Sequence, residues 1–178
     1  MKGFFVSPIS IKEMLEIYNA RFLIEFAMMK LSMQNGDDAW EANIIAKMYQ
    51  YNKYKESPPY DFKSFQERLH EVQKAMHDAC DSPTLKRIRD LLFDQSERYR
   101  NIWFKGLVDK DFFKVVNKKN ISKKEGDMLW DSLDKGLSSL TIAVINRDKE
   151  LVSKILKNKI NDFTKNIEKQ LKVLGIKK

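Results

Sequence analysis

The spacing of apolar residues constrains the fold of this chain more than any other feature of its sequence. From Ile11 onward, apolar side chains recur every three or four residues, and no convincing strand pattern appears after residue 8. Residues 11–33 carry two stripes: Leu15, Tyr18, Phe22, Phe26 and Met29 form one, and Met14, Ile17, Ile24, Met28 and Leu31 form the other. A helix that is apolar on two faces is expected to be buried on two sides, with a partner subunit as a candidate for one of them.

Helix start and stop signals predict an all-α fold, an antiparallel bundle of six or seven helices. Ser10 and Asp148 stand where caps are expected, and Ser82 followed by Pro83 is a strong helix start. The predicted helices cover about 11–33, 38–54, 61–80, 83–105, 123–146 and 149–172, with a short amphipathic segment at 109–116. The lysine-rich end after Leu171 is expected to fray.

The length and composition favour one globular domain without a membrane span. A chain of 178 residues can bury a sizeable core, and it holds no run of about 18 apolar residues and no secretion signal. The single cysteine, Cys80, cannot form an internal disulfide, which favours a reducing cytoplasm. No phosphate-binding glycine loop, Ser-His-Asp set or paired-cysteine metal motif is present, so we do not expect an enzyme.

The net charge of +8 raises the question of nucleic-acid binding. Much of the excess lies in residues 117–124 and 154–178, where lysine dominates without an arginine-aromatic cluster. We interpret these stretches as a solvated lysine-rich surface, with direct phosphate contact as the alternative.

A short pattern near the start gives the strongest pointer to a family. Residues 3–8 read Gly-Phe-Phe-Val-Ser-Pro, and Arg21 is followed four residues later by Glu25. This resembles the junction between the winged-helix DNA reader and the helical effector domain of GntR-type transcription regulators of the FadR subgroup. The resemblance implies that 1–9 are the remnant of a wing and linker, that 10–173 form an effector-binding and dimerisation domain, and that 174–178 are a tail. It also implies that the winged-helix part is missing.

The same resemblance bears on metal binding. Many family members hold a divalent cation with one Asp and three His side chains. Counting from Ser82-Pro83-Thr84-Leu85 and from the segment 143–148 places these ligand positions on Leu69, Gln73, Leu137 and Lys159. Leucine cannot ligate a metal and lysine brings a competing charge, so we expect a metal-free pocket and no cofactor. Lys159 is expected either to replace the metal as partner of an anionic ligand or to extend its amine to the rim of the bundle.

Other candidate residues follow from helical phase. Arg21 lies on an apolar stripe, where it either forms an internal ion pair with Glu25 or grips a ligand carboxylate or phosphate. The candidate ligand-binding residues are Arg21, Leu69, Gln73, Gln95, Arg98, Tyr99, Leu137 and Lys159. His70 and His77 lie too far apart along a helix to share one metal ion, and we interpret them as surface or hydrogen-bonded residues.

These observations lead to one functional hypothesis and two rivals. We expect an effector-binding and dimerisation domain that senses a small, anionic metabolite as a cytoplasmic homodimer and contacts DNA only through the missing winged helix. The first rival is a headless interaction module that dimerises with a full-length regulator. The second is an unrelated basic helical bundle that binds nucleic acid.

Overall fold

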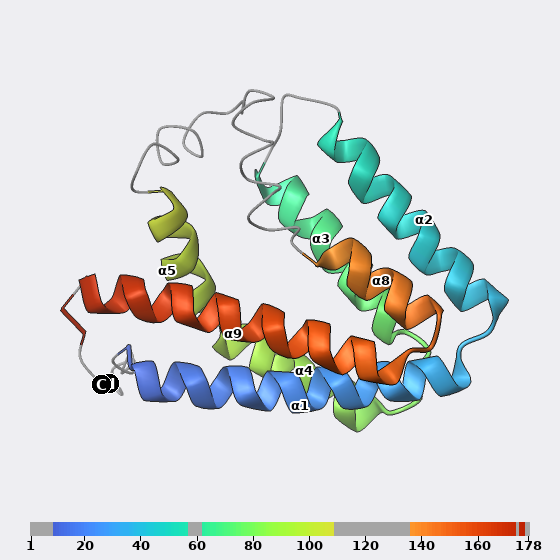
Figure 1. Ribbon diagram of the computed structural model, residues 1–178, viewed down its shortest axis with the longest axis horizontal. Coiled ribbons are helices and arrows are strands. Elements are labelled where there is room, and N and C mark those ends of the chain that lie inside the picture. The colour runs from blue at the N-terminus through green and yellow to red at the C-terminus, as the bar shows by residue number, and fades with distance from the viewer. Residues whose placement is uncertain (1–8, 57–61, 109–135, 174, 177–178) are drawn as a thin grey trace, which may run out of the picture.

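The computed structural model describes residues 9–56, 62–108, 136–173 and 175–176, and within these ranges the predicted all-α class is confirmed. The described residues form seven helices and no strand (Figure 1). The helices are α1 (Ile11–Asn35), α2 (Asp38–Lys55), α3 (Phe62–His77), α4 (Pro83–Gln95), α5 (Glu97–Val108), α8 (Leu137–Ile145) and α9 (Lys149–Val173).

The predicted caps explain where several helices begin. The Ser10 hydroxyl oxygen accepts a hydrogen bond from the backbone N–H of Glu13 at 3.4 Å, and the Asp148 carboxylate accepts one from the N–H of Leu151 at 2.9 Å. Ser82 caps α4 in the same way. These side chains satisfy backbone donors that have no partner inside the helix.

Two of the predicted helix boundaries are wrong. The single helix expected over 83–105 is two helices, α4 and α5, separated at the buried residue Ser96. The helix expected over 123–146 cannot run through Gly136, because this glycine has a left-handed φ of 84° and α8 begins only at Leu137. The first part of that predicted helix lies outside the described residues.

Helices α1 and α9 run antiparallel and side by side along the molecule (Figure 1). Helix α1 also packs on α3, α4 and α8, which agrees with the prediction that it is buried on more than one side. The second half of α1 and the first part of α9 build one apolar cluster together with α2, α3 and α8. The first half of α1 and the end of α9 build a second cluster with α5.

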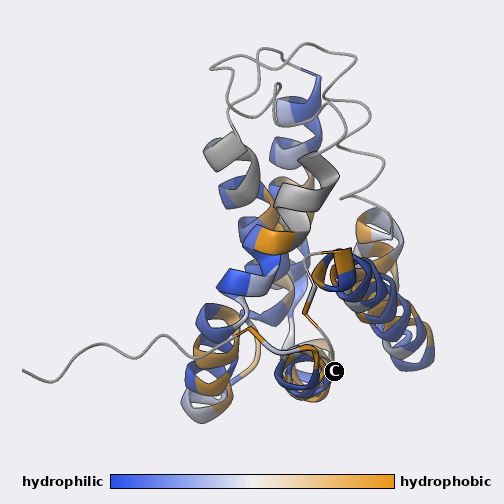
Figure 2. Cartoon of the chain, turned by 90° about the vertical axis from the view of Figure 1, so that its left-hand side faces the viewer, coloured by the Kyte–Doolittle hydropathy of each residue, from blue (hydrophilic) through white to orange (hydrophobic). Residues whose placement is uncertain are grey.

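The outer faces of the helices are mainly polar, although they include exposed apolar side chains such as Leu23, Ile45 and Ile142. Figure 2 shows that single helices carry both hydrophilic and hydrophobic residues. The lysines on the solvent-exposed face of α9 include Lys154, Lys157, Lys165, Lys169 and Lys172. No helix in the described ranges combines the length and the apolar character that crossing a lipid bilayer requires.

Candidate functional site

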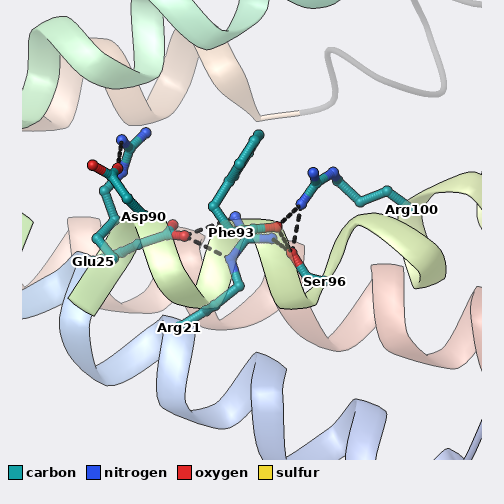
Figure 3. A network of polar contacts seen from close by, with 7 residues as sticks. Arg21, Glu25, Asp90, Phe93, Ser96 and Arg100 are labelled. Carbon is teal, nitrogen blue, oxygen red and sulfur yellow. Dashed lines mark hydrogen bonds and ion pairs between the residues drawn. The ribbon is translucent and has the colours of Figure 1, made fainter. Parts of the chain in front are cut away.

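A buried ion pair lies in the middle of α1. The residues before it contribute to one apolar cluster and the residues after it contribute to the other. The Arg21 guanidinium donates two hydrogen bonds to the same carboxylate oxygen of Glu25, at 2.9 and 2.8 Å (Figure 3). Each side chain is only 14% exposed. The first of the two interpretations of Arg21, an internal pair, is therefore present in the structure.

The break between α4 and α5 is bonded to the same pair. Arg21 donates to the Ser96 hydroxyl at 3.1 Å, and Arg100 donates to it at 2.5 Å. Ser96 in turn donates to the backbone carbonyl of Phe93 at 2.8 Å, and the Arg100 guanidinium lies 3.8 Å from the centre of the Phe93 ring (Figure 3). This network joins α1 to the junction of α4 and α5.

Burial and charge act in opposite directions on the ion pair. Burial alone would raise the pKa of Glu25, but Arg21 and, more weakly, His77 and Arg89 outweigh it, so that the pKa of the carboxyl is lowered. Burial likewise opposes the charge on Arg21, and Glu25 and Tyr18 reverse this and raise the pKa of the guanidinium. Both groups are therefore charged at neutral pH.

Beside this network, residues of α1, α3 and α4 line a cavity of about 390 Å³ that is partly open to solvent. This volume falls at the lower end of the range of about 300–1,000 Å³ that is typical of small-molecule sites. Its inner wall holds the buried or half-buried side chains Met28, His70, His77, Arg89 and Phe93. Its rim holds the exposed side chains Lys74, Asp78, Lys86, Asp90 and Asp94.

The inner wall carries buried polar groups that have no partner in the part of the chain that the structure describes. His77 is 4% exposed, and neither of its ring nitrogens has a hydrogen-bond partner among the described residues. The Nδ1 atom of His70 is also buried and has no hydrogen-bond partner among the described residues. The interpretation of His77 as a surface or hydrogen-bonded residue is therefore wrong, because its ring is enclosed by α1 and α4.

The surroundings of His77 disfavour its charged form. Burial lowers the pKa of the imidazole to about 4, although the nearby Glu25 carboxylate opposes this shift. Arg89 adds to the lowering, and the backbone carbonyl of Gln73 favours the charged ring without completing a hydrogen bond. The ring is therefore neutral at pH 7.

The structure does not bring Gln95, Arg98 and Tyr99 together with Arg21 in one cavity. Gln95 and Arg98 line a separate, mostly acidic groove of about 560 Å³. Tyr99 is fully buried, and its hydroxyl donates to Glu13 at 2.6 Å, while Arg98 pairs with the same carboxylate. The phase argument assumed one continuous helix, and the break at Ser96 changes the direction in which α5 side chains point.

The four positions that the resemblance equates with the family's metal ligands do not fit a cation in this chain. Leu137 is fully buried in the first apolar cluster, and Leu69 packs against that cluster. Gln73 is half-buried on α3, and the stem of Lys159 lies beside Gly136 at the start of α8. In the part of the chain that the structure describes, no three His, Cys, Asp or Glu residues gather in a metal-binding arrangement.

The sequence interpretation missed the cavity residues Arg89, Lys74 and Lys86. A signal was present, because His70, Lys74 and His77 follow one another at helical spacing and so share one face of α3. Arg89 could not be found from its own surroundings in the sequence, since only the packing of α4 on α1 buries its side chain to 11% exposure.

Comparisons with known proteins agree with this fold. Residues 16–118 match the FCD domain. The chain is 30% identical over 159 residues to the HTH-type transcriptional repressor GlaR of Escherichia coli K12, covering 88% of this chain and 64% of the relative. It is 28% identical over 105 residues to the uncharacterized HTH-type transcriptional regulator BphR of Paraburkholderia xenovorans LB400, covering 57% of this chain and 43% of the relative.

The chain thus spans less than two thirds of the length of either relative. No solved structure matches it. The resemblance found in the sequence is nevertheless confirmed, because the matched segment takes up more than half of the chain and both relatives are transcription regulators. The chain belongs to the FCD domain family, the effector domains of GntR-type transcription regulators.

Proposed function

We propose that this FCD domain senses a small anionic metabolite, without a metal ion, in the cavity between α3 and α4. The observation that carries this proposal is the inner wall of the cavity. There the Arg89 side chain, 11% exposed and paired with the exposed Asp90 carboxylate at 2.9 Å, stands with two imidazoles that have buried nitrogens without a partner among the described residues. A guanidinium binds carboxylates and phosphates through paired hydrogen bonds. A buried donor or acceptor without a hydrogen bond costs free energy, and a ligand that forms the missing bond removes that cost.

The contacts around the cavity support a relay to the start of α1. Phe93 lines the cavity and belongs to the Ser96 network, which adjoins α5. On α5, the Tyr99 hydroxyl lies 3.0 Å from the carbonyl of Ser10, immediately before α1. A ligand that favours one position of the α4–α5 junction would therefore bias the start of α1, where we propose that a DNA-binding domain joins residues 10–173.

The remaining parts of the proposal concern assembly and location. Two helical domains that relay a signal to a symmetric operator are expected to act as a homodimer in the cytoplasm. In this arrangement DNA is contacted only by the winged-helix part, and the lysine-rich face of α9 remains in solvent.

A ligand screen by thermal unfolding tests the proposal. The purified chain is mixed with mono-, di- and tricarboxylates, sugar acids, phosphorylated metabolites and acyl-CoA, each with and without a chelator. A ligand at about 100 times its dissociation constant adds about 2.7 kcal/mol of stability, which in a domain of this size raises the unfolding temperature by roughly 5–10 °C. We expect an anion to produce this shift and the chelator to leave it unchanged.

A matched pair of variants locates the site. Arg89→Met removes the guanidinium from the cavity wall, whereas Arg87→Met removes an exposed arginine that does not line it. We expect the ligand-induced shift to disappear in the first variant and to persist in the second. A shift that survives Arg89→Met would place the effector elsewhere, and a shift produced only by metal ions would contradict the metal-free site.

A further inference from the structure

The buried imidazole of His77 is the least explained polar group in the described part of the molecule. Its ring forms part of the cavity wall, is 4% exposed, and has no hydrogen bond to a described residue at either nitrogen. Buried polar groups in native proteins are nearly always bonded, so an exception that faces a cavity points to a ligand.

The charges that face this ring balance one another. On α1, the Glu25 carboxylate is held by Arg21. On α3 and α4, three cationic and three acidic side chains line the cavity: Lys74, Lys86 and Arg89 against Asp78, Asp90 and Asp94. His70, the remaining titratable group of the wall, has its pKa lowered by burial and by Arg89. With both imidazoles neutral, the cavity has no net positive charge to offset an incoming anion.

We propose, building on the function proposed above, that the anionic effector enters this cavity together with one proton, which His77 takes from solvent and holds while the ligand is bound. The imidazolium then donates a charge-assisted hydrogen bond to the anion, and the cavity stays electrically balanced when the ligand carries a single charge. Arg89 supplies the fixed part of the anion contact, and His77 supplies the part that depends on pH.

The geometry favours His77 over His70 as the group that takes the proton. His77 lies next to Glu25, whose carboxylate favours an imidazolium, and its complete burial keeps the ring neutral until an anion arrives. His70 is only half-buried and packs against Phe93 in a tilted arrangement, with ring centres 5.0 Å apart. A partly hydrated ring gains less from an anion than a ring that has no other partner.

Uptake of one proton makes the affinity depend on pH in a defined way. The ligand binds about tenfold more tightly for each pH unit of acidification, over the interval between the pKa of His77 in the empty cavity and its pKa in the complex. A ligand that does not itself titrate in this interval reports the protonation of the protein alone.

Methanesulfonate, a monoanion, and sulfate, a dianion, are suitable probes because neither gains a proton between about pH 5 and pH 8, where histidine titrates. Each is titrated into the isotope-labelled chain while NMR records the affinity and the imidazole signals of both histidines. We expect affinity to weaken about tenfold from about pH 5 to pH 6. We also expect the bound state at about pH 6 to show His77 with both ring nitrogens protonated.

Two matched variants complete the test. His77→Phe keeps a ring of similar shape without titratable nitrogens, and His70→Phe makes the same change on the other imidazole of the wall. We expect pH-independent and weaker binding in the first variant and an unchanged pH dependence in the second. The wild-type imidazole signals give the same information if His77→Phe fails to fold.

The outcomes separate the two proposals. Binding of either probe with an affinity that does not change with pH, or with protonation of His70 in place of His77, would overturn proton uptake by His77 and leave the anion site standing. Absence of binding at about pH 5, where the ring is most easily protonated, would overturn both.

Discussion

Arg21 and Glu25 lie one helical turn apart on α1, and both of the guanidinium's hydrogen bonds to the carboxylate converge on a single oxygen, Oε1. The centre of the Tyr18 ring lies 5.2 Å from the same guanidinium, which also donates a hydrogen bond to the Ser96 hydroxyl at 3.1 Å. The pair therefore connects the middle of α1 to the α4–α5 junction, and both partners stay charged although they are largely shielded from water.

Removing one partner of this pair should destabilise the fold more than removing both. Glu25→Gln leaves the Arg21 charge buried without its counter-charge, and we expect a loss of about 3 kcal/mol in the free energy of unfolding. Replacing both residues by methionine removes both charges and should cost less than Glu25→Gln alone. Urea unfolding of Glu25→Gln, Arg21→Met, Glu25→Met and the double methionine variant measures this, and additive effects of the two methionine substitutions would show that the two charges are not coupled.

The Ser96 hydroxyl should contribute to stability out of proportion to its size. It accepts from Arg21 and Arg100 and donates to the Phe93 carbonyl, so Ser96→Ala removes three hydrogen bonds at a buried position. We expect a loss of about 1–3 kcal/mol, measured by urea unfolding. Ser139→Ala, at an exposed position of α8, is the matched control and should change little. Equal effects of the two substitutions would contradict a structural role for the Ser96 network.

Much of the fold could be predicted because its signals are local. The caps Ser10, Ser82 and Asp148 and the apolar periodicity of α1 act within one or two helical turns. The break at Ser96 could not be predicted in this way, because it depends on Arg21, which is 75 residues away in the sequence. The sequence around residue 96 favours a continuous helix and carries no information about a contact with Arg21.

The candidate site was predictable only in part. The pairing of Arg21 with Glu25 follows from their spacing on one helix face, and it was one of the two predictions made for Arg21. The cavity requires the packing of three helices, so Arg89 and His77 gain their significance only from tertiary contacts. Gln95 and Arg98 line a different groove from the one that holds Arg89 and His77, and the direction of Arg98 depends on the α4–α5 break.

Gly36 is predicted to tolerate no side chain. A Cβ added there would lie 2.0 Å from the Cε3 atom of Trp40, whose indole is 6% exposed and donates a hydrogen bond to the Ala75 carbonyl at 2.9 Å. Because the clash falls on an anchored ring, we expect Gly36→Ala to lower the free energy of unfolding by about 2–4 kcal/mol.

A second glycine provides the control for Gly36. Gly175 has a positive φ of 79° but open space around it, so Gly175→Ala should show only backbone strain, about 1 kcal/mol. Urea unfolding of both variants checks the comparison. A smaller effect at Gly36 than at Gly175 would mean that Trp40 can move away.

The stability of the ligand-free chain should fall as the pH is lowered through the range in which His77 would titrate if exposed. In the folded state the pKa of His77 is about 4, against an ordinary value of 6.5. Between these values the unfolded chain binds a proton that the folded chain does not, so acidification favours unfolding.

The size and the origin of this pH dependence can be tested separately. The difference between the two pKa values corresponds to about 3 kcal/mol in the free energy of unfolding. This stability is lost progressively below about pH 6.5, and the loss is complete below about pH 4. Glu25, whose pKa is lowered by its surroundings, adds its own loss only at the acid end of this range.

In urea unfolding measured from about pH 7 to pH 4.5, His77→Phe should therefore show a much shallower slope than the wild type. The slope that remains should come from His70, whose pKa is also lowered. An unchanged slope in His77→Phe would mean that the ring is hydrated in solution, and would remove the physical basis for a proton that arrives with the ligand.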